Sequence, residues 1–132
     1  MAYPRWRKSA TCVYNIAYHL IWCPKYRRNI LVGDIEKRLK ELLLSRAKGL
    51  NVEIVQMEVM PDHVHLFVKS SPTYAPQFIV QQLKGITANV LRKEFPQLLR
   101  MPSLWTRSYY CESVGHISDE TIRQYIEDQK NK

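Results

Sequence analysis

The sequence predicts a single α+β domain in which a four-stranded antiparallel sheet carries two helices on one face. Four segments are rich in β-branched and aromatic residues, as strands are. Two longer segments repeat apolar residues at helical spacing. The order of these segments is β-α-β-β-α-β, which is the split βαβ pattern of ferredoxin-like (RRM-like) folds. A further helix is expected at the C-terminus.

The first half of the chain is expected to hold three strands and one helix. Residues 12–22 read as a strand that ends before Pro24. Gly33-Asp34 can begin a helix and Gly49 can close it. Residues 52–60 and 63–69 are expected to form a hairpin around Pro61-Asp62. The predicted stripe of the helix that packs on the sheet is Ile35, Leu39, Leu42, Leu43 and Ala47.

The second half adds a helix, a strand and a final helix. Pro76 suits the first turn of a helix that ends before Pro96. Residues 104–114 are expected to form the fourth strand, and Gly115 is a plausible hinge after it. Ser118 can cap the last helix. The helix that begins at Pro76 is expected to bury Ile79, Leu83, Ile86 and Val90, and the strand to place Trp105, Arg107, Tyr109 and Cys111 on one face.

Length and charge indicate one domain and a polyanionic partner. A chain of 132 residues suits one domain, which we divide into a basic tail (1–11), a βαββαβ core (12–114) and a terminal helix (115–132). The net charge of +8 favours nucleic acid as a partner. A merely basic surface is the alternative.

Cysteine use and hydropathy predict a cytoplasmic protein. The three cysteines are widely spaced and lack a paired motif, which is typical of a reducing compartment. The segment after the basic start is too polar for a signal peptide. No run approaches the ~20 apolar residues of a membrane span, so no membrane association is expected.

His63 and His65 are the most informative pair of residues in the sequence. They alternate with Val64 and Leu66 on a predicted strand, so both imidazoles point to the face opposite the apolar residues. Two imidazoles on one face are half of a metal site. The ordinary alternative is that such a pair is structural.

The predicted terminal helix supplies candidates that would complete the site. Ile122 and Ile126 form its apolar stripe, with Tyr125 and Gln129 one turn apart beside it. If this helix docks on the open face of the sheet, the Gln129 carbonyl oxygen joins the two imidazoles and Tyr125 lies beside the metal. Such a set leaves coordination positions free, as catalytic sites do. Tyr125 would then be the nucleophile, although a tyrosine beside isoleucine commonly just packs.

Three separated motifs resemble the single-tyrosine HUH transposases, the small TnpA-type enzymes of minimal prokaryotic insertion sequences. They are Pro61-Asp62-His63-Val64-His65, the run from Tyr18 to Arg27, and Tyr125-Ile126-x-x-Gln129. The resemblance covers nearly the whole chain.

The resemblance implies a chemistry, a cofactor and partners. It implies Mg²⁺ or Mn²⁺ bound by His63, His65 and Gln129. It also implies attack by Tyr125 on single-stranded DNA, leaving a 5′-phosphotyrosine and a free 3′-hydroxyl. The substrates would be subterminal hairpins at the element ends. Family members are homodimers, and the tyrosine helix can serve either subunit's site.

Candidate DNA contacts are basic residues, some of them interleaved with aromatic side chains. Such mixtures suit phosphates together with a stacked base. The ordinary alternative for each cluster is a set of solvated surface charges. His19 is expected to pack within the fold. The candidate contacts are Arg5, Arg7, Lys25, Arg27, Arg28 and Lys84.

Other functions stay open at this point. A non-catalytic RRM-like nucleic-acid-binding module would use the same sheet face, although the glycine-aromatic signature of RRM domains is absent. A hairpin-processing relative with the same chemistry could serve the host without a mobile element. A zinc hydrolase is disfavoured, because no Asp or Glu lies at a ligand-like spacing from the histidines.

Overall fold

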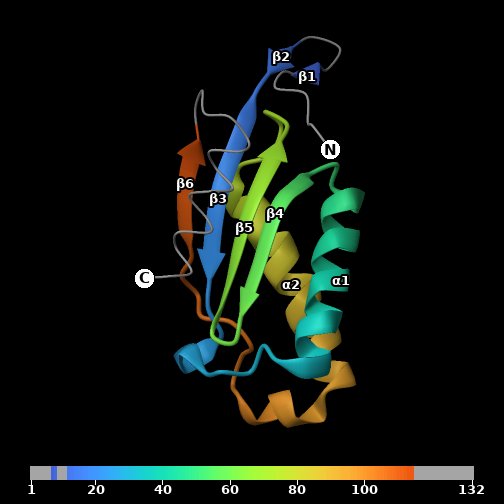
Figure 1. Cartoon of the computed structure of the whole chain (residues 1–132), viewed down its shortest axis with the longest axis vertical. Coiled ribbons are helices and arrows are strands. Elements are labelled where there is room, and N and C mark those ends of the chain that lie inside the picture. The colour runs from blue at the N-terminus through green and yellow to red at the C-terminus, as the bar shows by residue number, and fades with distance from the viewer. Residues whose placement is uncertain (1–6, 9–11, 115–132) are drawn as a thin grey trace.

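A four-stranded antiparallel sheet with two helices on one face forms the core, as the sequence predicts (Figure 1). The computed structural model describes residues 7–8 and 12–114. The sheet order is β4-β5-β3-β6, which is the ferredoxin-like arrangement. Its strands are β3 (Ile16–Trp22), β4 (Glu53–Met60), β5 (His63–Ser70) and β6 (Tyr110–Val114).

The first predicted strand is divided into two parts by Asn15. Residues 12–22 do not form one continuous strand: β2 (Val13–Tyr14) precedes β3 and pairs with β1 (Arg7–Lys8) in a separate ribbon. Asparagine is poor in strands, which explains the break. Figure 1 shows this ribbon extending beyond the end of the sheet. Two residues of the basic tail, Arg7 and Lys8, therefore pair with β2 through their backbone.

The two helices cover the same face of the sheet. α1 (Gly33–Gly49) buries the predicted stripe, Ile35, Leu39, Leu42, Leu43 and Ala47. The buried stripe of α2 (Pro76–Glu94) differs from the prediction in its second half: Thr87 and Leu91 are buried, whereas Ile86 and Val90 are only partly so. Burial of Thr87 is tolerated because its hydroxyl donates to the Leu83 carbonyl at 2.7 Å and accepts from Trp105 Nε1 at 3.0 Å.

The fourth strand is shorter than predicted. β6 begins at Tyr110, so Trp105, Arg107 and Tyr109 do not share a strand face with Cys111. Before it, the chain runs through a short 3-10 helix, η2 (Pro96–Arg100), and an irregular segment. Trp105 anchors that segment by packing edge-to-face on Trp22, with ring centroids 6.0 Å apart. Tertiary packing thus overrides the strand propensity of residues 104–109.

The hydrophobic core lies between the sheet and the helices. Leu20 and Trp22 of β3 and Leu66 of β5 meet Leu39 of α1 and Leu83 of α2 there, all of them fully or almost fully buried. In residues 7–8 and 12–114, no helix is long and apolar enough to cross a membrane.

Truncation of Leu66 should destabilise the protein strongly. Leu66 pairs with Leu20 and Met57 in the sheet and is fully buried, so Leu66→Ala leaves a cavity and should lower the free energy of unfolding by about 2–5 kcal/mol. Urea denaturation at neutral pH measures this. The control is Leu44→Ala on α1, whose side chain is exposed and whose loss should cost less than about 0.5 kcal/mol. Equal losses for both variants would contradict the assigned core.

Candidate metal and nucleic-acid site

His63 and His65 lie side by side on β5, on the sheet face that the helices leave uncovered. The alternating residues Val64, Leu66 and Val68 are buried in the main core on the helix side. The two imidazole rings are 4.5 Å apart between centroids. The two-residue repeat of the strand therefore brings both imidazoles together, as the sequence predicts.

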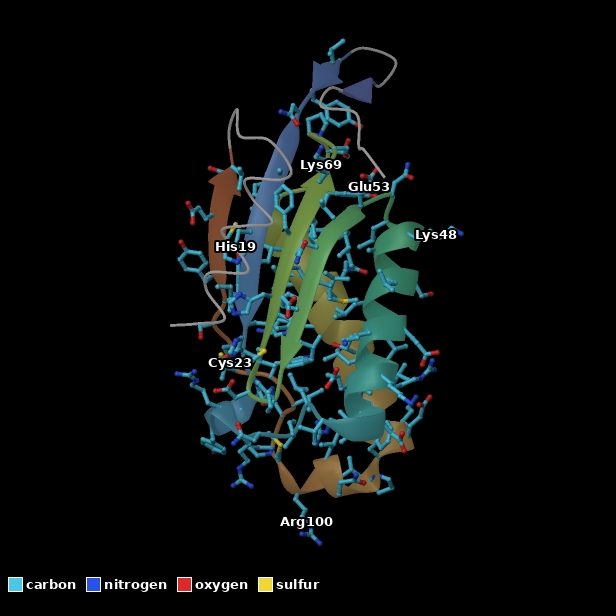
Figure 2. All side chains as sticks on the ribbon, viewed as in Figure 1. His19, Cys23, Lys48, Glu53, Lys69 and Arg100 are labelled. Atoms are coloured by element: carbon cyan, nitrogen blue, oxygen red, sulfur yellow. The ribbon has the colours of Figure 1, made fainter. Side chains whose placement is uncertain are left out.

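The face opposite the helices is less open than expected. Phe67, two residues after His65, is fully buried in a second apolar cluster with Ala17 and Val55. Lys69 is also almost fully buried, and pairs in register with Glu53 of β4. Figure 2 shows Lys69 and Glu53 near one end of the sheet and Cys23 near the other. The histidine pair is at the Cys23 end, because Trp22 pairs with Val64.

His19 is a third imidazole on the same face. It is buried on β3, with its ring centroid 5.7 Å from that of His65 and 5.9 Å from that of Tyr110. Burial lowers the pKa of His19, and the charge of Glu112 partly opposes that effect. Its burial agrees with the expectation that His19 packs within the fold, and its closeness to His65 follows because Ile21, two positions later, pairs with His65.

Asp62 connects His63 to a basic residue of a distant segment. The Asp62 Oδ1 atom lies 2.6 Å from His63 Nδ1, and Asp62 Oδ2 accepts a hydrogen bond from Arg27 at 3.1 Å. Burial alone would raise the pKa of Asp62, but its hydrogen bond with His63 and the charges of His63 and Arg27 outweigh it and hold that pKa below its ordinary value. Asp62 is therefore a carboxylate at neutral pH.

The two imidazoles have properties that suit metal ligands. Burial, followed by the charges of His63 and His19, lowers the pKa of His65 to about 4, while Asp62 opposes the shift. His65 is therefore neutral at pH 7, and its buried Nδ1 has no hydrogen-bond partner among the described residues. His63 has a carboxylate behind it, as metal-binding histidines commonly do. Both side chains thus fit a divalent cation.

The described residues include two of the three predicted metal ligands. In residues 7–8 and 12–114 there is no group of three or more His, Cys, Asp or Glu side chains that could hold a metal ion. His19, His63 and His65 therefore do not complete a site together. The other predicted members, Tyr125 and Gln129, lie outside the described residues, as does Arg5.

Some of the predicted basic contacts lie close together around an exposed aromatic ring. Lys25 and Arg28 flank the exposed Tyr26, with their cationic groups 5.5 Å and 5.8 Å from its ring centroid. This cluster lies on and beside the 3-10 turn η1 (Lys25–Arg27), at the histidine end of the sheet. For Arg7 the structure describes only the backbone, in β1.

Lys84 is directed into the protein. Its Nζ donates to the Thr106 carbonyl at 2.5 Å and to the Ser108 carbonyl at 3.4 Å. Burial lowers its pKa, with Cys23 opposing. In this arrangement Lys84 links α2 to the segment before β6, and its predicted contact with DNA stays a prediction.

Comparison with known proteins finds transposases of insertion sequences that are similar over nearly the whole chain. The sequence matches the family model described as IS200-like transposase over residues 12–129. ISDra2 transposase TnpA of Deinococcus radiodurans is 40% identical over 129 residues, covering 96% of this chain and 92% of that protein. The transposase for insertion sequence element IS200 of Salmonella typhimurium is 29% identical over 132 residues, covering 98% and 81% respectively.

Solved structures agree with the fold. A crystal structure of a proposed transposase from Deinococcus radiodurans has a TM-score of 0.77 at 38% identity, covering 93% of this chain and 97% of that one. A REP-associated tyrosine transposase bound to a REP hairpin has a TM-score of 0.60 at 12% identity, covering 90% and 67%. The second likeness shows the shared fold alone.

The stability of the metal-free protein should fall on mild acidification. The pKa of His65 is about 4 in the folded state and near its ordinary value of 6.5 when unfolded, so the unfolded chain binds more protons between these values. The stabilising contribution is complete above about pH 6.5 and is lost as pH falls toward 4. It amounts to at most about 3 kcal/mol. Urea denaturation between pH 7 and pH 5, with a chelator present, measures the part lost in that window, about 2 kcal/mol.

A matched variant isolates the contribution of His65. His65→Gln removes the titrating group and should make the dependence of unfolding free energy on pH shallower in that window. Identical slopes for the wild-type protein and His65→Gln would show that His65 is not held neutral by its surroundings.

Proposed function

Because the chain belongs to the IS200-like transposase family, we propose that it cuts and rejoins single-stranded DNA at insertion-sequence ends through a covalent tyrosine intermediate. The observation that carries this proposal is the pair of adjacent imidazoles on β5, in which His63 contacts the Asp62 carboxylate and His65 is held neutral by burial. The near full-length likeness to transposases of insertion sequences favours a mobile element over a host-serving relative. We further propose that residues 1–132 act as one domain.

We assign the metal site to His63, His65 and Gln129. The imidazole nitrogens and the carboxamide oxygen form a mixed nitrogen and oxygen set suited to Mg²⁺ or Mn²⁺. When bound, such a cation polarises phosphate oxygens and offsets the charge that develops on them. The protein's contribution on β5 is rigidity, because the apolar residues alternating with the histidines are fixed in the core.

Tyr125 is the proposed nucleophile. Its phenolic oxygen bonds to phosphorus as the bond from phosphorus to the 3′ oxygen breaks, so the 5′ side of the DNA is held as phosphotyrosine. The phenolic proton is lost and the departing 3′ oxygen gains a proton. A second 3′-hydroxyl then displaces the tyrosine, so the phosphodiester is conserved and ATP is not required. At pH 7 only about one phenol in a thousand is ionised, so local positive charge must favour the phenolate.

The surface around η1 is the proposed path for the DNA strand. Lys25, Arg27 and Arg28 supply positive charge at the histidine end of the sheet, and Tyr26 offers an exposed ring for a base. Arg5 and Arg7 of the N-terminal segment are proposed additional contacts with hairpin DNA. Lys84 stays a proposed further contact, although its Nζ donates to the Thr106 carbonyl within the fold.

A homodimer is the proposed assembly. β6 lies at the edge of the sheet, pairing within the described chain with β3 alone, and most of its residues are exposed. An exposed edge strand is a natural place for a second copy to pair. We propose that this strand lies near the dimer interface and that Tyr125 can serve the site of either subunit.

Tyr125→Phe should abolish the covalent intermediate. The substitution removes the attacking oxygen and keeps the ring, so folding and DNA binding should persist. The assay incubates the protein with Mn²⁺ and single-stranded DNA carrying the hairpins that flank its gene, followed by denaturing electrophoresis. The control is Tyr26→Phe, which retains an aromatic face and should still form the adduct. A protein–DNA adduct formed by Tyr125→Phe would refute this choice of nucleophile.

His63→Ala should separate cleavage from binding. Loss of a metal ligand should reduce cleavage below detection, whereas hairpin affinity should stay within about tenfold because phosphate contacts elsewhere dominate it. Gel shift and cleavage assays at one fixed salt concentration measure both. Parallel loss of binding and cleavage would indicate that His63 is a structural residue.

A further inference from the structure

Arg27 is one of the basic residues at the histidine end of the sheet, and its guanidinium is directed at Asp62. We propose that Arg27 is a positioning residue: by holding Asp62, it fixes the orientation of the His63 ring and leaves Nε2 of that ring free to bind the metal. This inference rests on the proposed metal site and names a residue that supports it from outside.

The carboxylate of Asp62 is shared between two partners. One oxygen, Oδ1, lies 2.6 Å from His63 Nδ1, and the other, Oδ2, lies 3.1 Å from the Arg27 guanidinium. Because the carboxylate can only accept, the hydrogen on the neutral His63 ring is held at Nδ1. The lone pair is then at Nε2, the tautomer in which a second-sphere carboxylate orients a metal-binding histidine.

The backbone holds Arg27 in an unusual conformation. Tyr26 and Arg27 have φ angles of 62° and 50°, a left-handed region that residues other than glycine seldom adopt. The Arg27 amide donates to the Pro24 carbonyl at 2.8 Å, and the Lys25 amide donates to the Leu104 carbonyl at 2.8 Å. Strained backbone that is anchored in this way commonly serves a site. Here it directs the guanidinium at Asp62.

The loop after η1 is also tied to the turn that carries Asp62. The Leu31 amide donates to the Pro61 carbonyl at 3.0 Å, so the segment that follows Arg27 and the β4–β5 turn are held together at a second point. Arg27 and Asp62 are therefore presented by two connected loops.

Stability of the fold is a poor explanation for the ion pair. The side chain of Arg27 is 68% exposed and that of Asp62 is 28% exposed, and pairs exposed to this degree contribute little to stability. The consequence of the pair is instead local, because it fixes which carboxylate oxygen faces His63.

The first test observes the His63 ring directly in the metal-free protein. Nitrogen chemical shifts of the imidazole, measured by NMR above pH 7.5, report which nitrogen carries the hydrogen. Wild-type protein should show the Nδ1–H form. Asp62→Ala should shift His63 toward the Nε2–H form that free histidine prefers. Arg27→Ala should shift it part of the way, and Arg27→Lys should restore much of the wild-type signal.

Arg28→Ala is the matched control. Arg28 is the next residue, equally charged and exposed, and its guanidinium lies over Tyr26. Its removal should leave the His63 signals unchanged. Melting curves for every variant check that the fold is retained.

The second test measures Mn²⁺ affinity by calorimetry. Asp62→Ala should weaken binding about 10- to 100-fold, as expected for the loss of a second-sphere partner. Arg27→Ala should weaken it about two- to fivefold, in line with an exposed ion pair. Arg28→Ala should leave it unchanged.

The outcomes separate this inference from the proposed function. If Arg27→Ala and Arg28→Ala lower hairpin affinity alike and neither alters the His63 spectrum, Arg27 is a DNA contact only and the inference is wrong. The ring measurement needs neither DNA nor Tyr125. It therefore stands even if the tyrosine proves not to be the nucleophile.

Discussion

The alternation of side chains along β5 is the constraint on which the rest of the structure depends. Val64, Leu66 and Val68 close the core against both helices, and the intervening positions place His63 and His65 on the opposite face. A shift of one residue in the pairing of β5 would turn the imidazoles into the core and the apolar residues out of it. The large energetic cost of that exchange means that folding itself orients the histidine pair. The proposed metal site is thus specified by the same pattern that specifies the sheet.

Much of this arrangement could be predicted from the sequence, because it depends on local periodicity. The 3.6-residue repeat of a helix predicts the buried stripe of α1. The two-residue repeat of a strand predicts the hairpin around Pro61-Asp62 and the closeness of His63 to His65. The family was also identifiable, since its motifs are short runs read directly from the chain. Tyr125 and Gln129 stay predictions, because they lie outside the described residues.

The features that could not be predicted depend on contacts between residues far apart in the chain. Trp105 lies in an apolar, aromatic segment typical of a strand, yet it packs on Trp22 and binds Thr87, so β6 starts later than its composition indicates. Lys84 and Arg27 both read as surface cations in the sequence. Their partners, the Thr106 carbonyl and Asp62, are visible only once the fold is known. Charge alone therefore does not show that these two side chains also bind other parts of the protein.

The exit point of the chain from the sheet has a consequence for assembly. Val114, the last residue of β6, pairs with Ala17, whereas Val64, beside His63, pairs with Trp22 at the other end of β3. These positions are about 17 Å apart at the rise of an extended strand. The polypeptide between Val114 and Tyr125 is long enough to span this distance within one subunit, and in the proposed homodimer it could extend toward the second subunit instead. Exchange of the terminal segment between protomers, a form of domain swapping, would then leave the core of each protomer unchanged.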